Sequence, residues 1–228
     1  MILKSIFACC LTGLVLAGCS GGTGSDANRP KSGFGQTAIT AIGSLFGASP
    51  PVVDARSVLT AQFVEQVQTP LILIVAQRLD SALTMIPLSQ NGETVQWRDA
   101  VGGGLFRRNG ILVGTRGAGH DLLSADVEPL RAALRAGGGR DVTRINRILN
   151  GENQVVAEQY ICDVRATGDE TLTFYGKSYE TTRFVEACRG DGPAFENRYW
   201  IDRGGVIRRS LERVSPQVGF LLLDVLAD

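Results

Sequence analysis

The chain has almost no histidine and no excess of charge of either sign. His120 is the single histidine among 228 residues, and 23 Lys and Arg residues balance 23 Asp and Glu residues. Catalytic zinc sites usually use two or three histidines, and histidine is the commonest acid–base catalyst. A nucleic-acid-binding surface normally shows as a basic excess. We therefore expect no metal, no cofactor, no catalytic residues and no nucleic-acid partner.

The chain also lacks an apolar run of the roughly 20 residues that a membrane-spanning helix needs. Ile6–Ala17 is apolar, follows Lys4 and has the length of a signal-peptide core. The run ends in Leu16-Ala17-Gly18-Cys19, which resembles the lipobox of bacterial lipoproteins. This resemblance implies a lipoprotein signal peptide over residues 1–18 and cleavage before Cys19. It also implies that acyl chains such as palmitate are attached at Cys19.

The expected anchor is permanent, because each buried CH₂ contributes about 0.8 kcal/mol and several acyl chains act together. Ser20 follows the cysteine, where an aspartate would be the inner-membrane retention signal. We therefore expect attachment to the outer membrane, with the folded domain facing the periplasm. The alternative is an ordinary secretory signal that contains a chance cysteine.

Cysteine is scarce after the signal peptide. Of the five cysteines, Cys9 and Cys10 leave with the signal peptide, Cys19 is assigned to lipid, and Cys162 and Cys188 remain. Disulfides persist in an oxidising compartment, so we predict a Cys162–Cys188 bridge. It closes a loop of about 26 residues, worth roughly 3–4 kcal/mol in the chain-entropy model. The competing interpretation, a metal or redox pair, has no Cys-x-x-Cys to support it.

The composition divides the rest of the chain into two parts. Residues 19–51 are rich in Gly, Ser, Ala and Pro and read as a flexible tether. Ala38–Phe46 within it has helical apolar spacing, which fits a loosely docked segment better than a membrane-surface helix. Residues 52–228 are long enough to form one β-rich domain.

Two short helices are expected in this domain, at about 54–68 and 124–136. In the first, Asp54 can cap the start and apolar residues recur at four-residue steps. In the second, Ser124 can cap the start and Gly137–Gly139 ends the helix.

The rest of the pattern is β. The chain has 28 glycines, about 12% against a usual 7% or so. Asn91-Gly92 and Asn109-Gly110 are hairpin signals, and a turn is expected at Gly168-Asp169. Short strands at 8–12-residue spacing indicate a mainly β fold, an antiparallel sandwich or barrel-like sheet.

One polar loop is the strongest candidate for binding. Arg116, His120 and Asp121 lie in a glycine-rich segment between two expected strands, where ligand contacts are common. The same residues could instead form a structural corner. A nucleophile elbow of the type Gly-x-Ser-x-Gly is missing, and Gly176-Lys177-Ser178 lacks the strand–loop–helix context of a phosphate loop.

Aromatic residues offer a second, weaker candidate. Trp97, Tyr199 and Trp200 could form a sugar-stacking platform. In a β protein such rings more often lie in the core or at half-buried strand positions.

A series of motifs runs from about residue 54 to 226 and includes Asn109-Gly110-Ile111-Leu112-Val113-Gly114-Thr115-Arg116-Gly117, Tyr160-x-Cys162, Tyr179-x-Thr181-x-Arg183-x-x-Glu186-x-Cys188 and Asn197-Arg198-Tyr199-Trp200-Ile201-Asp202. This series resembles the YjbF family of lipoproteins, related to the group 4 capsule polysaccharide lipoprotein. It implies a mainly antiparallel β fold and an outer-membrane lipoprotein that acts in capsule or exopolysaccharide assembly or export. One departure is Ile207-Arg208, where an aromatic residue is expected.

The leading hypothesis is therefore a non-enzymatic accessory lipoprotein that contacts polysaccharide-export proteins or the polysaccharide itself. A glycan-binding module is the first alternative. A periplasmic glycan-processing enzyme is the second, and it needs two carboxylates facing each other in a cleft, about 5 Å or 6.5–9.5 Å apart.

Overall fold

The computed structural model describes residues 53–152 and 154–228. The signal peptide, Cys19, the tether and Ala38–Phe46 lie outside the described residues. The expectations for them stay predictions.

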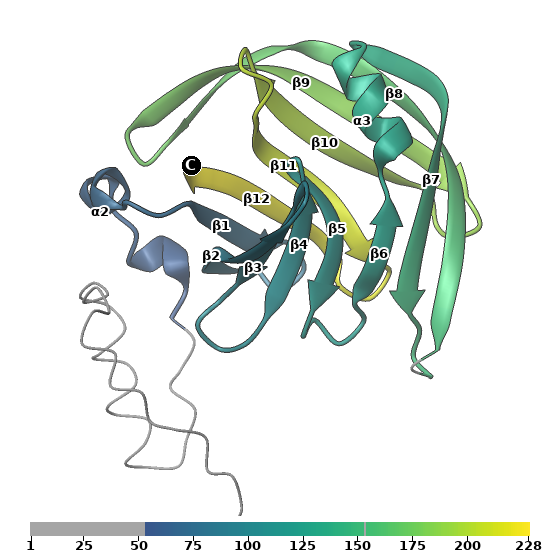
Figure 1. Ribbon diagram of the computed structural model, residues 1–228, viewed down its shortest axis with the longest axis horizontal. Coiled ribbons are helices and arrows are strands. Elements are labelled where there is room, and N and C mark those ends of the chain that lie inside the picture. Colours follow the sequence, from purple (N-terminus) through teal and green to yellow (C-terminus); the bar gives the residue numbers. More distant parts are fainter. Residues whose placement is uncertain (1–52, 153) are drawn as a thin grey trace, which may run out of the picture. The chain divides into compact units, whose positions relative to one another are not determined.

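Twelve antiparallel strands form one continuous sheet, as the mainly β pattern predicts (Figure 1). Their spatial order is β5-β4-β3-β2-β1-β12-β11-β10-β9-β8-β7-β6. The strands are β1 Leu71–Ala76, β2 Ser81–Asn91, β3 Thr94–Arg98, β4 Gly104–Arg108, β5 Ile111–Arg116, β6 Leu122–Asp126, β7 Gly138–Leu149, β8 Val155–Phe174, β9 Lys177–Gly190, β10 Phe195–Asp202, β11 Ile207–Ser215 and β12 Gly219–Ala227.

The two edges of the sheet, β5 and β6, follow each other in the chain and come close together. A Cβ built on Gly114 of β5 would lie 3.4 Å from the carbonyl oxygens of Leu122 and Leu123 on β6. The sheet therefore curls into a nearly closed, barrel-like form (Figure 1). This arrangement confirms the barrel-like alternative of the sequence analysis.

The hairpin signals act as predicted at two turns. Gly92 has φ +56°, and Asn109 and Gly110 have φ 47° and +84°, the left-handed backbone that such turns require. The turn expected at Gly168-Asp169 is wrong. β8 continues through it, and a register shift between Ala166 and Gly168 leaves Thr167 as the extra residue of a bulge next to the glycine.

Both helical regions exist, with different bounds. The first is split into a 3₁₀ turn, η1 (Ala55–Ser57), and a short helix, α2 (Ala61–Gln66). Asp54 caps only η1, by accepting from the backbone N–H of Arg56 at 2.9 Å. Thr60 caps α2, by accepting from Phe63 N–H at 3.1 Å. A second capping residue therefore begins a new helix where one continuous helix was expected.

The second helix, α3, covers Glu128–Arg135, and the expected start at Ser124 is wrong. Ser124 and Ala125 belong to β6, where they pair with Arg147 and Asn146 of β7. Pairing with a neighbouring strand thus overrides the local capping signal. α3 packs against β7 and β8 (Figure 1).

The buried apolar residues form three clusters. Two of them fill the interior. The third lies on the opposite face of β1. Leu130 and Leu134 of α3 join Tyr160 and Phe184 in the first cluster. Trp97 belongs to the second, with residues of β1, β4, β5 and β12. The third holds residues of η1, α2, β1, β12 and the far end of the β8–β9 hairpin.

Candidate functional site

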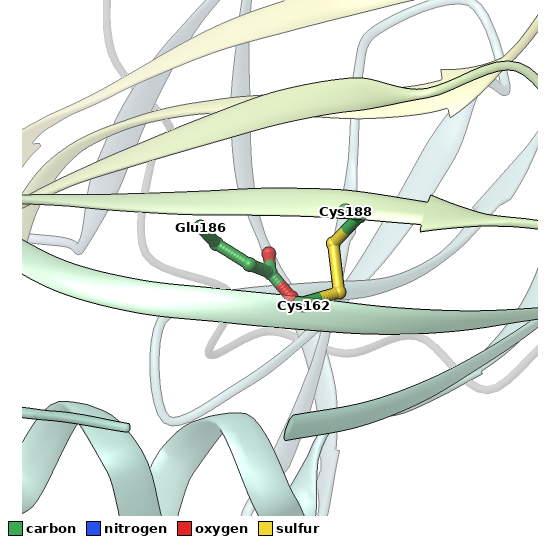
Figure 2. Close-up of side chains that lie close together, drawn as sticks. All are labelled: Cys162, Glu186 and Cys188. Carbon is green, nitrogen blue, oxygen red and sulfur yellow. A yellow bond between two sulfur atoms is a disulfide. The ribbon is translucent and has the colours of Figure 1, made fainter. Parts of the chain in front are cut away.

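The predicted bridge between Cys162 and Cys188 is present. The two residues oppose each other on β8 and β9, with a Cα–Cα distance of 4.1 Å. Figure 2 shows the bridge with the Glu186 side chain beside it. Ligand atoms of these three residues lie within 4.8 Å of one another, the one such trio in residues 53–152 and 154–228. The two sulfurs are bonded to each other, so the trio is structural.

Glu186 belongs to a buried polar network that crosses the interior. Arg144 on β7 donates to both carboxylate oxygens of Glu186 at 3.2 Å, and both side chains are 0% exposed. Asn197 Nδ2 donates to Glu186 at 2.8 Å, and Tyr199 OH donates to it at 2.9 Å. Glu186 is therefore held by four donor contacts from three side chains.

A second carboxylate, that of Glu212 on β11, contacts the same Tyr199 hydroxyl. Its Oε2 is 3.3 Å from Tyr199 OH and accepts from Leu112 N–H at 3.0 Å. Burial raises the pKa of Glu212 above 4.5, although Arg144 and Arg107 oppose the shift. Burial, with the nearby carboxylates, also raises the pKa of Tyr199 well above 10. These carboxylates are closed off inside the protein, which is not the open cleft that a glycan-processing enzyme needs.

The residues of the predicted binding loop differ in their surroundings. Asp121 is buried and accepts from Thr115 Oγ1 at 2.7 Å, Gly117 N–H at 3.0 Å and Ala118 N–H at 3.1 Å. Its contacts fix the β5–β6 turn, as the structural-corner alternative expected. Ligand binding by Asp121 stays a prediction.

Arg116 and His120 of the same loop line a pocket of about 430 Å³ at one end of the barrel-like sheet. Its walls are mainly aliphatic and include Ile74, Met85 and Leu105. The structure thus places these two predicted residues beside a cavity. Ligand binding by them stays a prediction.

The three aromatic residues take the core positions that the sequence analysis favoured over a sugar-stacking platform. Trp97 is 8% exposed, Tyr199 is 0% exposed and Trp200 is 8% exposed. Trp97 faces the interior cluster, and Trp200 donates from Nε1 to Glu170 at 2.8 Å in the third cluster. Rings buried in this way contribute to packing and leave no face for a sugar.

A groove that no sequence motif predicts lies on the side of β3 and β4 that faces away from the interior. One hollow of about 810 Å³ lies toward β2 and the start of α3, and another of about 430 Å³ lies toward β5, β6 and β7. The two share Thr94, Phe106 and Arg108, so we treat them as one feature, the outer groove. Both volumes lie in the range of ligand sites.

A sequence signal for the outer groove exists in the two-residue alternation of the strands. Thr94, Phe106 and Arg108 alternate with Trp97, Leu105 and Arg107, which are buried. Alternation shows which residues share a face of one strand. It does not show that β3 and β4 pair with β2 and β5, which is what assembles the groove.

The described residues contain no helix that is both long enough and apolar enough to cross a membrane. The fold matches that of a lipoprotein of solved structure, the hypothetical lipoprotein YmcC from Escherichia coli (K12). The TM-score is 0.66 at 20% sequence identity, and the match covers 86% of this chain and 98% of that chain. No curated protein matches the chain by sequence.

The family model described as "Group 4 capsule polysaccharide lipoprotein gfcB, YjbF" matches residues 36–226. This match covers most of the chain, so the chain belongs to that lipoprotein family. The resemblance found in the sequence motifs is thereby confirmed.

Proposed function

We propose that this protein is a non-enzymatic accessory lipoprotein that acts in the assembly or export of a capsule or exopolysaccharide. The observation that carries the proposal is the family match over residues 36–226. The lipobox ending in Cys19 adds the anchor. The protein is held in the outer membrane by lipid on Cys19, and residues 52–228 face the periplasm.

The bridge between Cys162 and Cys188 supports this location. Structural disulfides persist in oxidising compartments such as the periplasm and are rare in the cytosol. The bridge is buried between β8 and β9, where it has a stabilising role. A protein of the cell envelope would keep such a disulfide oxidised.

The buried network supports a non-enzymatic role. Glu186 and Glu212 converge on Tyr199 in the manner of a catalytic pair, but all three are 0% exposed. Their donors come from β5, β7 and β10, so the network joins strands that are not neighbours in the sheet. Contact with an export protein or with the polysaccharide then falls to the surface of the domain.

Deleting the gene tests the proposal. We expect the amount of cell-surface polysaccharide to fall, and a plasmid copy of the wild-type gene to restore it. A Cys19→Ala copy should fail to restore it, because the lipid anchor needs the thiol. A Cys10→Ala copy is the matched control and should restore it, because Cys10 lies in the expected signal peptide. Polysaccharide of unchanged amount, length and attachment in the deletion strain would contradict the proposal.

A further inference from the structure

The outer groove has an aromatic floor. Phe106 on β4 pairs with Gly114 on β5, and a Cβ built on Gly114 would lie 3.3 Å from Phe106 Cδ2. The ring therefore lies against the glycine backbone and stays only partly buried. The Arg116 guanidinium lies over this ring, 5.1 Å from its centroid. Phe106 and Arg116 thus present apolar surface and N–H donors next to each other.

The half of the outer groove toward β7 holds arginines that lack acidic partners. Arg116 and Arg147 both line this hollow, and neither makes an ion pair with any described residue. Both side chains belong to exposed residues. Asp126 is the one acidic residue in the lining of this hollow. This half of the groove therefore favours an anion.

The acidic residues at the other half are already neutralised. Arg131 donates to Glu93 at 2.7 Å and to Glu128 at 2.8 Å, and Arg108 donates to Glu128 at 3.2 Å. The hydrogen bond from Arg131 lowers the pKa of Glu93 to about 2. The remaining lining includes the neutral hydrogen-bonding groups of Ser89 and Gln96. This half suits hydroxyl groups more than charge.

We propose that the outer groove binds a segment of an acidic polysaccharide. A uronate carboxylate lies between the guanidinium groups of Arg116 and Arg147, and the C–H face of a sugar ring packs on exposed surface of Phe106. Arginine suits the carboxylate because its planar fork binds it with two parallel hydrogen bonds. Neutral polar groups toward β2 receive the sugar hydroxyls. This inference rests on the proposed function, whose ligand class and contact surface it specifies.

Binding of a defined acidic saccharide tests the inference. The probe is polygalacturonate oligomers, titrated by calorimetry into the purified acylated protein in detergent. Dextran oligomers of equal length are the neutral comparison. We expect binding of polygalacturonate that weakens as salt is added, and much weaker binding of dextran.

Variants assign the binding to the groove. Arg116→Ala and Arg147→Ala should each weaken polygalacturonate binding about tenfold or more, because each removes charge-assisted hydrogen bonds to the carboxylate. Phe106→Leu should also weaken it and keeps an apolar side chain at that position. Arg165→Ala is the matched control, because it removes an exposed arginine of β8 that is not part of the groove lining. Thermal unfolding of each variant verifies that it is folded.

Several results would overturn the inference. The first is that the wild type does not bind polygalacturonate, and the second is that it binds dextran with equal affinity. The third is that Arg165→Ala weakens polygalacturonate binding as much as Arg147→Ala does. Binding confined to vesicles that contain phosphatidylglycerol would assign the arginines to a lipid surface instead. If any of these results appears while deletion of the gene still lowers surface polysaccharide, the groove assignment is wrong and the proposed function is unaffected.

Discussion

Replacing Glu186 with glutamine is expected to lower the free energy of unfolding by about 3–5 kcal/mol, the usual cost of removing one partner of a buried ion pair. The variant keeps the shape of the side chain and an oxygen that can accept from Asn197 and Tyr199. It leaves the Arg144 guanidinium buried without its countercharge. Chemical denaturation of the purified protein, with intact disulfide, measures the effect.

The double variant Arg144→Met/Glu186→Gln separates this cause from general damage. Removing both charges should recover more than half of the loss, because the uncompensated charge is gone. The matched control is Asp163→Asn, which breaks the exposed pair between Arg189 and Asp163 at 3.3 Å. That loss should stay below about 1 kcal/mol. A double variant as unstable as Glu186→Gln alone would show that the two residues are not coupled.

Removing the bridge with Cys162→Ala/Cys188→Ala is expected to lower the free energy of unfolding by about 3–4 kcal/mol. The cysteines are 26 positions apart, and the bridge limits the unfolded chain more than the folded one. In a domain of this size, the loss corresponds to a fall in the melting temperature of about 6–16 °C. Scanning calorimetry or circular dichroism during heating measures it.

Reduction provides the control for the cysteine variant. Dithiothreitol should lower the melting temperature of the wild type by a similar amount and leave that of the double alanine variant unchanged. A wild-type melting temperature that does not respond to reduction, together with a stable double variant, would show that the bridge contributes little.

Local signals in the sequence were sufficient for several features of the fold. Asn91-Gly92 and Asn109-Gly110 predicted hairpins because few residue pairs accept left-handed backbone angles so readily. The Cys162–Cys188 bridge followed from counting the cysteines left after Cys19. The hairpins depend on residues that are adjacent in the sequence, and the bridge depends on a residue type that occurs only a few times.

Features that depend on neighbouring strands could not be predicted in the same way. Ser124 has the chemistry of a helix cap, but pairing of β6 with β7 placed it in a strand. Gly168 has the chemistry of a turn, but β9 continues the ladder past it, and the glycine lies next to a bulge at Thr167. In both places, long-range hydrogen bonds were stronger than the local preference.

The candidate site shows the same limit. The glycine-rich loop points to Arg116 and His120, and both line a pocket. Residue type alone suggests Trp97 and Trp200 for sugar stacking, but both are buried. Phe106 and Arg147 come from strands that are not adjacent in the sequence, so no local motif joins them. The outer groove became visible only with the sheet order.

The central claim is that this domain works on a lipid anchor in the cell envelope. The most direct measurement is the intact mass of the native protein extracted from membranes, with sequencing of its first residue. We predict a chain that begins at Cys19 and carries the mass of three acyl chains. A chain that still begins at Met1, or a mature chain with an unmodified Cys19, would contradict the account.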